Sequence, residues 1–204
     1  WEGLMSNNKS MVTGGILAGG RATRMGGIDK GIANLKGRML IEWVLDRLAP
    51  QVSNIIINAN RSHQQYGKLG YTVVADTVND FRGPLAGVAA ILSECETPWL
   101  MTVPCDSPLI PLDLVSRLSD QVFKENSRLG VVHDGERLQP VFMLLHRYLL
   151  EDLNAFLDSG GRKIDHWLSN NSFETVSFPK CKKMFLNANT LDDLERAHVS
   201  LNSS

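Results

Sequence analysis

The sequence predicts an α/β fold of three layers, in which a mostly parallel sheet is covered by helices on both faces. Two observations predict it. Apolar segments of strand length alternate with segments of helical period along the first half of the chain. One strand candidate, residues 54–59, contains three consecutive isoleucines, which is typical of a strand buried on both faces. Strands that alternate with helices form βαβ units, and these units pair their strands in parallel.

The elements of the first half follow one another at short intervals. Pro50 is expected to end the first helix, and Pro84 suits the first turn of the second. In order, the predicted elements are a strand at 12–17, a helix at 40–48, strands at 54–59 and 71–75, a helix from Gly83-Pro84 to 92, a strand at 99–103 and a helix at 111–124.

The second half is less regular. Strands at 129–133 and 141–145 flank a polar turn, which predicts a hairpin or another antiparallel excursion. Thr190 and Asp193 resemble a capping box that begins a last helix. Between them we expect helices at 148–157 and 163–168 and short strands near Thr175 and Phe185.

Composition excludes several classes of protein. The chain has 204 residues, with 21 Lys and Arg against 22 Asp and Glu, so its net charge of −1 argues against a nucleic-acid or membrane partner. Three scattered cysteines without a CxxC pair fit neither a disulfide framework nor a zinc site, and they suit a reducing compartment. We therefore expect a cytoplasmic protein.

One domain is expected, over residues 11–204, because no linker, repeat or low-complexity segment interrupts the chain. Residues 1–10 are polar and are expected to be a disordered N-terminus. Within them, Met5 is the expected natural start, and residues 1–4 are expected to be a remnant of cloning.

Four predicted strand ends carry residues suited to binding. Ligands of an open parallel sheet bind at the carboxyl ends of its strands. The residues at these ends are Leu17, Ala18, Gly19 and Gly20 after the first strand, then Asn58, Asp76 and Asp106 after the next three. Glycine, amide and carboxylate groups are what a nucleotide and a metal ion require.

The segment from residue 17 to residue 30 is the most informative. Its glycines let backbone N–H groups approach phosphate oxygens, and Arg21, Arg24 and Lys30 add three cations, which favours a triphosphate. Gly31 follows Lys30, so the segment is not a Walker A loop, and it lacks the spacing of a dinucleotide fingerprint. The alternative is a wide turn whose basic side chains are solvated.

Other candidate residues also have structural interpretations. Asp76 and Asp106 could be strand-end turn residues or helix caps. Cys105 is interpreted as a small buried thiol rather than a nucleophile. The five histidines show no spacing typical of metal ligands.

The chain resembles the molybdenum cofactor guanylyltransferases, a family of GT-A-like nucleotidyltransferases. The likeness to GT-A-like nucleotidyltransferases in general rests on one loop, Leu-Ala-Gly-Gly-Arg-Ala-Thr-Arg-Met-Gly-Gly-Ile-Asp-Lys-Gly. The family likeness rests on further motifs in the family's order, at residues 58–61, 83–87, 104–108, 133–137 and 187–190. The resemblance implies a single nucleotidyltransferase domain with the Rossmann-like fold of nucleotide-diphospho-sugar transferases.

The resemblance also implies the reaction and its partners. GMP would pass from GTP to the terminal phosphate of molybdopterin, or of its molybdenum-loaded form, with release of pyrophosphate. Cofactor chaperones and acceptor molybdoenzymes would be further partners. The open alternatives are a cytidylyltransferase for the same cofactor, a sugar-nucleotide pyrophosphorylase and a non-catalytic nucleotide-binding module.

Roles for individual residues follow from the matched motifs. The resemblance assigns Leu17, Ala18, Gly19 and Gly20 to the nucleotide site, Lys30 to the triphosphate, Asn58 and Asp76 to the GTP pocket, Gly83 and Pro84 to the base, and Asp106 to Mg²⁺. Asn187 and Asn189 are candidates for the acceptor site or, alternatively, turn and cap residues.

The chemistry needs charge neutralisation more than proton transfer. An acceptor phosphate is already ionised near neutral pH, so no catalytic histidine is expected. Arg24 and Lys30 would stabilise the departing pyrophosphate, and Asp106 would hold Mg²⁺, which takes most of its ligands from water and phosphates. These three residues are the predicted catalytic set.

Overall fold

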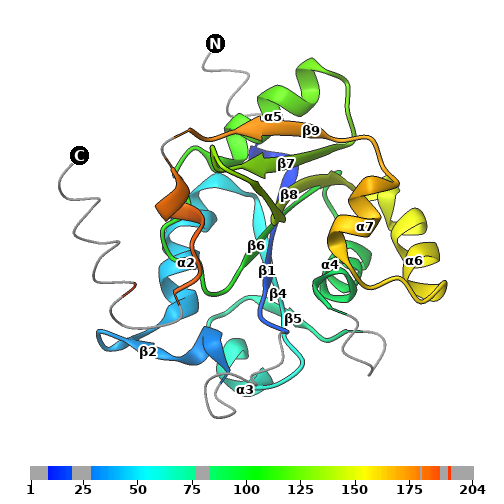
Figure 1. The fold of residues 1–204 in the computed structure, drawn as a ribbon. Helices are drawn as coiled ribbons and strands as arrows, with labels where there is room; N and C mark the ends of the chain where they lie inside the picture. The colour runs from blue at the N-terminus through cyan, green and yellow to red at the C-terminus, as the bar shows by residue number, and fades with distance from the viewer. Residues whose placement is uncertain (1–8, 20–28, 77–82, 180, 189–192, 194–204) are drawn as a thin grey trace.

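A seven-stranded sheet forms the centre of the computed structural model, which describes residues 9–19, 29–76, 83–179, 181–188 and 193 (Figure 1). The strands lie in the order β5-β4-β1-β6-β8-β7-β9. Their bounds are Val12–Leu17 for β1, Asn54–Asn58 for β4, Thr72–Val74 for β5, Trp99–Pro104 for β6, Leu129–His133 for β7, Leu138–His146 for β8 and Glu174–Ser177 for β9.

Most of the strand pairs are parallel. β1 pairs in parallel with β4 and with β6, β4 with β5, and β7 with β9. β8 is antiparallel to both of its neighbours, β6 and β7. The predicted mostly parallel sheet and its antiparallel excursion are therefore confirmed.

Helices cover both faces of the sheet, which makes the three predicted layers (Figure 1). The helices α2 (Leu40–Leu48) and α5 (Leu114–Lys124) contribute to one hydrophobic cluster, and α4 (Pro84–Ser93), α6 (Leu150–Asp158) and α7 (Ile164–Ser169) to the other. The isoleucines of β4 alternate between the two: Ile55 and Ile57 belong to the first cluster and Ile56 to the second. The run is apolar throughout because both faces of the strand are buried.

The remaining elements are short. They are the strands β2 (Asn34–Leu35) and β3 (Arg38–Met39), the helix α3 (His63–Gly67) and the 3₁₀ helices η1 (Lys30–Ile32), η2 (Ala49–Gln51), η3 (Arg147–Leu149) and η4 (Lys182–Phe185). β2 and β3 pair with each other in an antiparallel hairpin.

The helix predicted at 111–124 begins later, at Leu114. The side chain of Gln51 explains the shift. Its amide nitrogen donates to the carbonyl of Pro111 over 2.9 Å, and its amide oxygen accepts from the backbone N–H of Val115 over 3.0 Å. Gln51 therefore supplies a partner for one of the N–H groups that the first helical turn cannot satisfy itself.

The strand predicted near Phe185 was wrong, because Phe185 ends the 3₁₀ helix η4. Its ring packs edge-on against Phe142 and Phe178, with centroids 5.0 and 5.4 Å apart. Core packing of a single aromatic side chain, and not strand pairing, explains the apolar segment. The strand predicted near Thr175 is confirmed as β9.

Two predictions fall outside the part of the chain that the structure describes. The last helix was expected to begin at Thr190, and of its residues the structure describes only Asp193. Residues 1–8 of the expected disordered N-terminus are also outside the described part. Among the described residues, none of the helices has both the length and the apolar character that crossing a bilayer would require.

β8 is longer than predicted and contains an irregularity near the site edge. Its register with β7 shifts between Val131 and Val132, and Pro140 in the shifted stretch has no N–H to donate. The buried hydroxyl of Thr102 on β6 donates to the carbonyl of Val141 over 2.6 Å. The same hydroxyl oxygen accepts from the backbone N–H of Met143 over 3.4 Å, so Thr102 ties β6 to the irregular stretch of β8.

Replacing Thr102 by valine should therefore destabilise the protein. The isosteric side chain keeps the packing but removes the hydrogen bonds to the carbonyl of Val141 and from the N–H of Met143, at a cost of about 1–3 kcal/mol in the free energy of unfolding. Urea unfolding would measure it. Ser159→Ala, which removes an exposed hydroxyl bonded to the carbonyl of Phe156, is the control and should change stability by less than about 0.5 kcal/mol. Equal effects of the two substitutions would contradict the interpretation.

Candidate active site

A cavity of about 380 Å³ opens at the carboxyl ends of β1, β4 and β6. The chain leaves β1 toward β4 on one side and returns to β6 on the other, so this edge is the switch point of the sheet, where open α/β folds bind ligands. The lining residues are Leu17, Ala18, Gly19, Asp29, Lys30, Asn58, Asp76, Gly83, Pro84, Pro104, Cys105, Asp106 and Val141.

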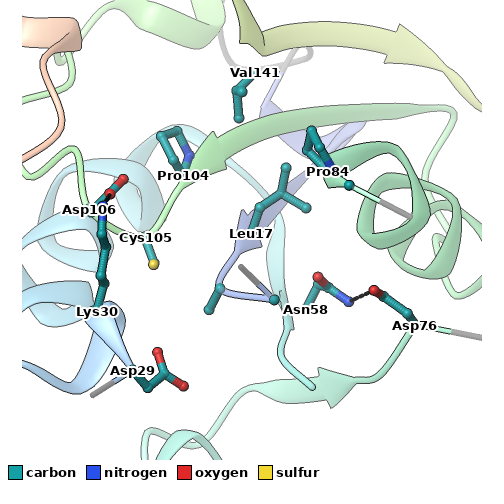
Figure 2. A pocket seen from close by; sticks show the side chains of 13 residues that line it. Leu17, Asp29, Lys30, Asn58, Asp76, Pro84, Pro104, Cys105, Asp106 and Val141 are labelled. Carbon is teal, nitrogen blue, oxygen red and sulfur yellow. Dashed lines mark hydrogen bonds and ion pairs between the residues drawn. The ribbon is translucent and has the colours of Figure 1, made fainter. Parts of the chain in front are cut away.

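An ion pair occupies one wall of the cavity (Figure 2). The Lys30 ammonium donates to Oδ2 of Asp106 over 3.0 Å, although the two residues are 76 positions apart. Asp106 is only 6% exposed, and its backbone carbonyl accepts from the N–H of Ala188 over 2.7 Å. A carboxylate this buried needs a cationic partner, and Lys30 supplies it.

The opposite wall consists of amides and a carboxylate. Asn58, at the end of β4, donates to Oδ1 of Asp76 over 2.8 Å (Figure 2). Asn60 donates to Oδ2 of the same carboxylate over 2.8 Å and accepts from the backbone N–H of Asp76 over 2.8 Å. The three side chains form a closed network that fixes the ends of β4 and β5 relative to each other.

The start of α4 forms a third side of the cavity. Gly83 precedes the helix with φ of 77°, a backbone region that side-chain-bearing residues rarely adopt, and Pro84 occupies the first turn. A Cβ built on Gly83 would also come within 3.0 Å of the carbonyl oxygen of Arg162. The glycine is thus required both by the turn and by the adjacent chain.

Cys105 lies between the two acidic residues of the Lys30 wall, Asp106 and Asp29. Burial raises the pKa of its thiol well above the usual value, and the charges of Asp106 and Asp29 raise it further. The thiol is therefore protonated at neutral pH. This supports the interpretation of Cys105 as a buried thiol and argues against a nucleophile.

The residues present suit a magnesium ion. Asp106 offers carboxylate oxygens at the cavity, beside space for phosphates, and Mg²⁺ is commonly bound by one or two carboxylates together with substrate oxygens and water. No group of three His, Cys, Asp or Glu side chains suited to a metal was found in the described part of the chain.

The structure brings most of the predicted site residues together. Nine of them line the cavity: Leu17, Ala18, Gly19, Lys30, Asn58, Asp76, Gly83, Pro84 and Asp106. Asn187 is not among the lining residues, but it accepts from the hydroxyl of Ser107, next to Asp106, over 3.1 Å. Three predicted residues, Gly20, Arg24 and Asn189, lie outside the described residues.

Asn60, Asp29 and Tyr66 have polar contacts at the site and were not predicted, and the lining residues Pro104 and Val141 were not predicted either. Asn60 and Asp29 belong to motifs quoted above, so their neighbours in sequence gave a signal for them. Tyr66 donates to Asp29 from α3, which no motif covers, and nothing in the sequence indicated that contact.

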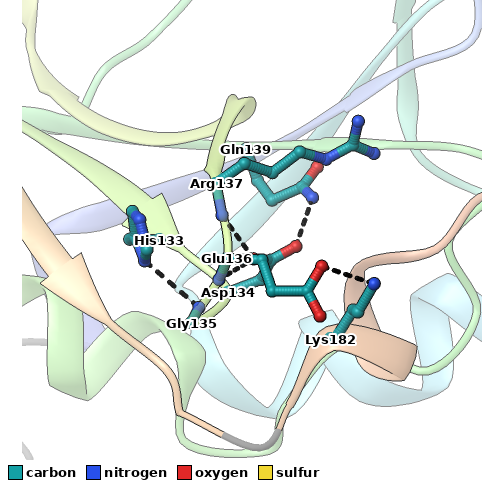
Figure 3. A network of polar contacts seen from close by, with 7 residues as sticks. All are labelled: His133, Asp134, Gly135, Glu136, Arg137, Gln139 and Lys182. Atoms are coloured by element: carbon teal, nitrogen blue, oxygen red, sulfur yellow. Dashed lines mark hydrogen bonds and ion pairs between the residues drawn. The ribbon is translucent and has the colours of Figure 1, made fainter.

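A rigid turn lies beyond the cavity, between β7 and β8 (Figure 3). The carboxylate of Asp134 is 2% exposed and accepts from the backbone N–H groups of Glu136 and Arg137 and from the amide of Gln139. Burial acts to raise the pKa of Asp134, but these hydrogen bonds outweigh it and lower the pKa. Lys182 of η4 pairs with Glu136 across the turn.

Comparison with known sequences gives consistent matches. The family model described as a MobA-like NTP transferase domain matches residues 14–172. A molybdenum cofactor guanylyltransferase of Shewanella sp. (strain MR-4) is 44% identical over 93% of this chain and 96% of its own. One from Cupriavidus pinatubonensis is 46% identical over 92% of this chain and 96% of its own.

Solved structures show the same fold. The molybdopterin-guanine dinucleotide biosynthesis protein A of Archaeoglobus fulgidus superposes with a TM-score of 0.73 at 24% identity, covering 94% of this chain and all (100%) of that one. The 4-diphosphocytidyl-2C-methyl-D-erythritol synthase of Anaerococcus prevotii gives 0.72 at 12% identity, covering 98% and 99%. The fold predicted from the resemblance, that of nucleotide-diphospho-sugar transferases, is thereby confirmed.

Asn60→Ala should weaken nucleotide binding. It removes two hydrogen bonds that hold Asp76 at the cavity, so the affinity for a nucleoside triphosphate, measured by calorimetry, should fall about 5- to 10-fold. Asn54→Ala, at the opposite end of β4, is the matched control and should bind normally. Equal affinities of the Asn60 variant and the native chain would contradict a supporting role for Asn60.

The lowered pKa of Asp134 predicts a pH dependence of stability. The stabilisation is complete above the ordinary carboxyl pKa of about 3.9 and is lost as the pH falls through the lower folded value. Below about pH 4, the native chain should therefore lose more free energy of unfolding than Asp134→Asn does. Urea unfolding across this range would test it, and parallel pH curves for the two proteins would argue against it.

Proposed function

The chain belongs to the molybdenum cofactor guanylyltransferases, and we propose that its cavity transfers GMP from GTP to the terminal phosphate of molybdopterin. The products are a molybdopterin guanine dinucleotide and pyrophosphate. Membership confirms the family resemblance inferred from the sequence. It also makes the chain a nucleotidyltransferase of molybdenum cofactor biosynthesis.

One observation carries the assignment to this cavity. Its two walls have different chemistry: a lysine–carboxylate pair on one side and an amide–carboxylate network on the other. A triphosphate needs cations, and a base and ribose need neutral amides and carboxylate acceptors. The two walls therefore suit the two ends of one nucleotide.

The reaction is an in-line displacement at phosphorus. An oxygen of the acceptor phosphate forms a bond to the α-phosphorus of GTP, and the bond from that phosphorus to the oxygen bridging the β-phosphate breaks. The bridging oxygen leaves with the electron pair as part of pyrophosphate. Because the acceptor oxygen is already ionised, the chain has to position two anions and offset their repulsion.

Lys30 is suited to offsetting the repulsion between the two anions. Its ammonium lies at the cavity, and its pairing with Asp106 holds it there before substrate arrives. We propose that it contacts triphosphate oxygens and stabilises the charge that develops on pyrophosphate. Arg24 is proposed to assist, from the adjoining part of the same loop.

Asp106 is the proposed ligand of Mg²⁺. When bound, Mg²⁺ supplies charge neutralisation at phosphate oxygens. Two backbone hydrogen bonds fix the chain around Asp106, just after β6. The N–H of Ala188 donates to the carbonyl of Asp106, and the N–H of Cys105 donates to the carbonyl of Leu17. Its carboxylate is therefore presented by rigid backbone.

The other proposed contacts follow the shape of the cavity. Leu17, Ala18 and Gly19 line it at the end of β1, Asn58 and Asp76 face them for the nucleoside, and Gly83 and Pro84 approach the base. The adjoining Gly20 is proposed to extend the β1 side. For the acceptor we propose Asn187, which is bonded to the residue after Asp106, together with Asn189. Cofactor chaperones and acceptor molybdoenzymes are the partners we expect to receive the product in the cytoplasm.

Asp106→Ala should strongly slow pyrophosphate release. We would measure release from GTP, CTP, ATP and UTP in turn, with Mg²⁺ and molybdopterin, for the native chain and for the variant. Release is expected with GTP alone, and the variant should lose about 10²-fold or more of the rate, because the metal ligand and the partner of Lys30 disappear together. Asp46→Ala, which breaks an exposed ion pair with Arg38, is the control and should keep full activity.

The alternatives predict different results in the same assay. Release with CTP in place of GTP would overturn the choice of nucleotide and leave the mechanism standing. Binding of GTP without release, from folded protein and verified acceptor, would indicate a non-catalytic binding module instead.

A further inference from the structure

Asp29 connects the loop that carries Lys30 to a side chain outside the cavity. Its Oδ1 atom accepts from the hydroxyl of Tyr66 over 2.6 Å and from the backbone N–H of Gly31 over 3.2 Å. The second bond caps η1, whose first residue is Lys30. A single carboxylate oxygen therefore joins Tyr66 to the short helix that presents the ammonium.

Tyr66 is a buried and rigid anchor. It lies on α3, between β4 and β5, and its side chain is 0% exposed within the hydrophobic cluster on the α2 side of the sheet. Burial raises the pKa of its hydroxyl far above the usual value, so the group remains protonated and acts as a donor. A buried hydroxyl with a charged acceptor forms one of the stronger hydrogen bonds in a protein.

Packing at Gly31 shows how closely η1 is held. A Cβ built at position 31 would collide with the Tyr66 hydroxyl oxygen and would lie 3.3 Å from Cβ of Cys105. The backbone of η1 thus rests directly on Tyr66 and on the residue before Asp106. A glycine is needed there because the hydroxyl occupies the place of a side chain.

Two backbone hydrogen bonds of η1 lie within the segment itself. The N–H of Ile32 donates to the carbonyl of Asp29, and that of Ala33 to the carbonyl of Lys30, so these bonds move with the segment. At its far end the segment is tied by the bond from Leu40 N–H to the Ala33 carbonyl. Tyr66 therefore holds η1 at its N-terminal end, through Asp29, and the bond from Leu40 holds the chain at Ala33, directly after η1.

We propose that Tyr66 is a positioning residue, whose hydroxyl acts through Asp29 to fix η1 so that the Lys30 ammonium stands at Asp106. The proposal rests on the proposed function, because Lys30 matters to the reaction only if the cavity binds a triphosphate. Tyr66 itself is not among the residues that line the cavity.

A double-substitution cycle separates positioning from general stability. Tyr66→Phe removes the hydroxyl alone and should lower kcat/KM for GTP about 10-fold in the native background. In a Lys30→Ala background the same change should cost less than about 2-fold, because the group that it positions is gone. A merely structural role would give the same factor in both backgrounds.

Hydrogen exchange of the ligand-free protein gives a second readout that does not depend on the reaction. Backbone amides of residues 30–33 should exchange faster in Tyr66→Phe than in the native chain, because the anchor of η1 is removed. Trp167→Phe is the control, since it removes the hydrogen bond from the buried Trp167 Nε1 to the exposed Asp152 on the other face of the sheet. It should leave both kcat/KM and the exchange of residues 30–33 unchanged.

The outcomes distinguish the two hypotheses. Faster exchange in Tyr66→Phe, with a loss of kcat/KM in the native background but not in the Lys30→Ala background, supports the positioning role. Unchanged exchange in Tyr66→Phe, or equal losses in both backgrounds, overturns it. If the native chain turns over no GTP at all, the proposed function fails, and the exchange measurement alone then decides whether Tyr66 fixes η1.

Discussion

The parallel pairing of β1 with both β4 and β6 is the constraint on which the site depends. It places the carboxyl ends of three strands at one edge, and the ladder continues past the strand ends. The N–H of Ala18 donates to the carbonyl of Asn58 over 2.8 Å, and the N–H of Cys105 to the carbonyl of Leu17 over 3.1 Å. The residues that follow the three strands are thus held by backbone bonds, before any side chain contributes to the cavity.

Each wall of the cavity contains a carboxylate that already has hydrogen-bond partners in the ligand-free protein. Asp106 is paired with an ammonium and Asp76 with two amides, so neither acid depends on a ligand for its partner. Such pairs give modest net stability, because desolvation offsets much of their attraction. Their value is geometric: they fix charged groups where phosphate charge is expected, in a chain whose net charge is only −1.

Rigidity at the site comes from elements on both faces of the sheet. α4 belongs to one hydrophobic cluster and supplies Pro84, whereas Tyr66 belongs to the other and holds η1 through Asp29. The bulge of β8 brings Val141 to the cavity edge, where Thr102 satisfies its carbonyl. The groups proposed to contact a ligand are thus supported by residues that do not line the cavity.

The amino-acid pattern alone predicts the strands of the first half, the layers and the strand-end residues, because periodicity is local and parallel strands bring their carboxyl ends to one edge. It also determined the family, through motifs such as residues 17–31. Three contacts became visible only in the folded chain: Phe185 packs as a core aromatic, Asn60 bonds to Asp76 across 16 residues, and Tyr66 bonds to Asp29 across 37. These contacts join residues that are distant in the sequence, and local patterns of residue type do not specify which distant residues will meet. The partners come together only when the chain folds.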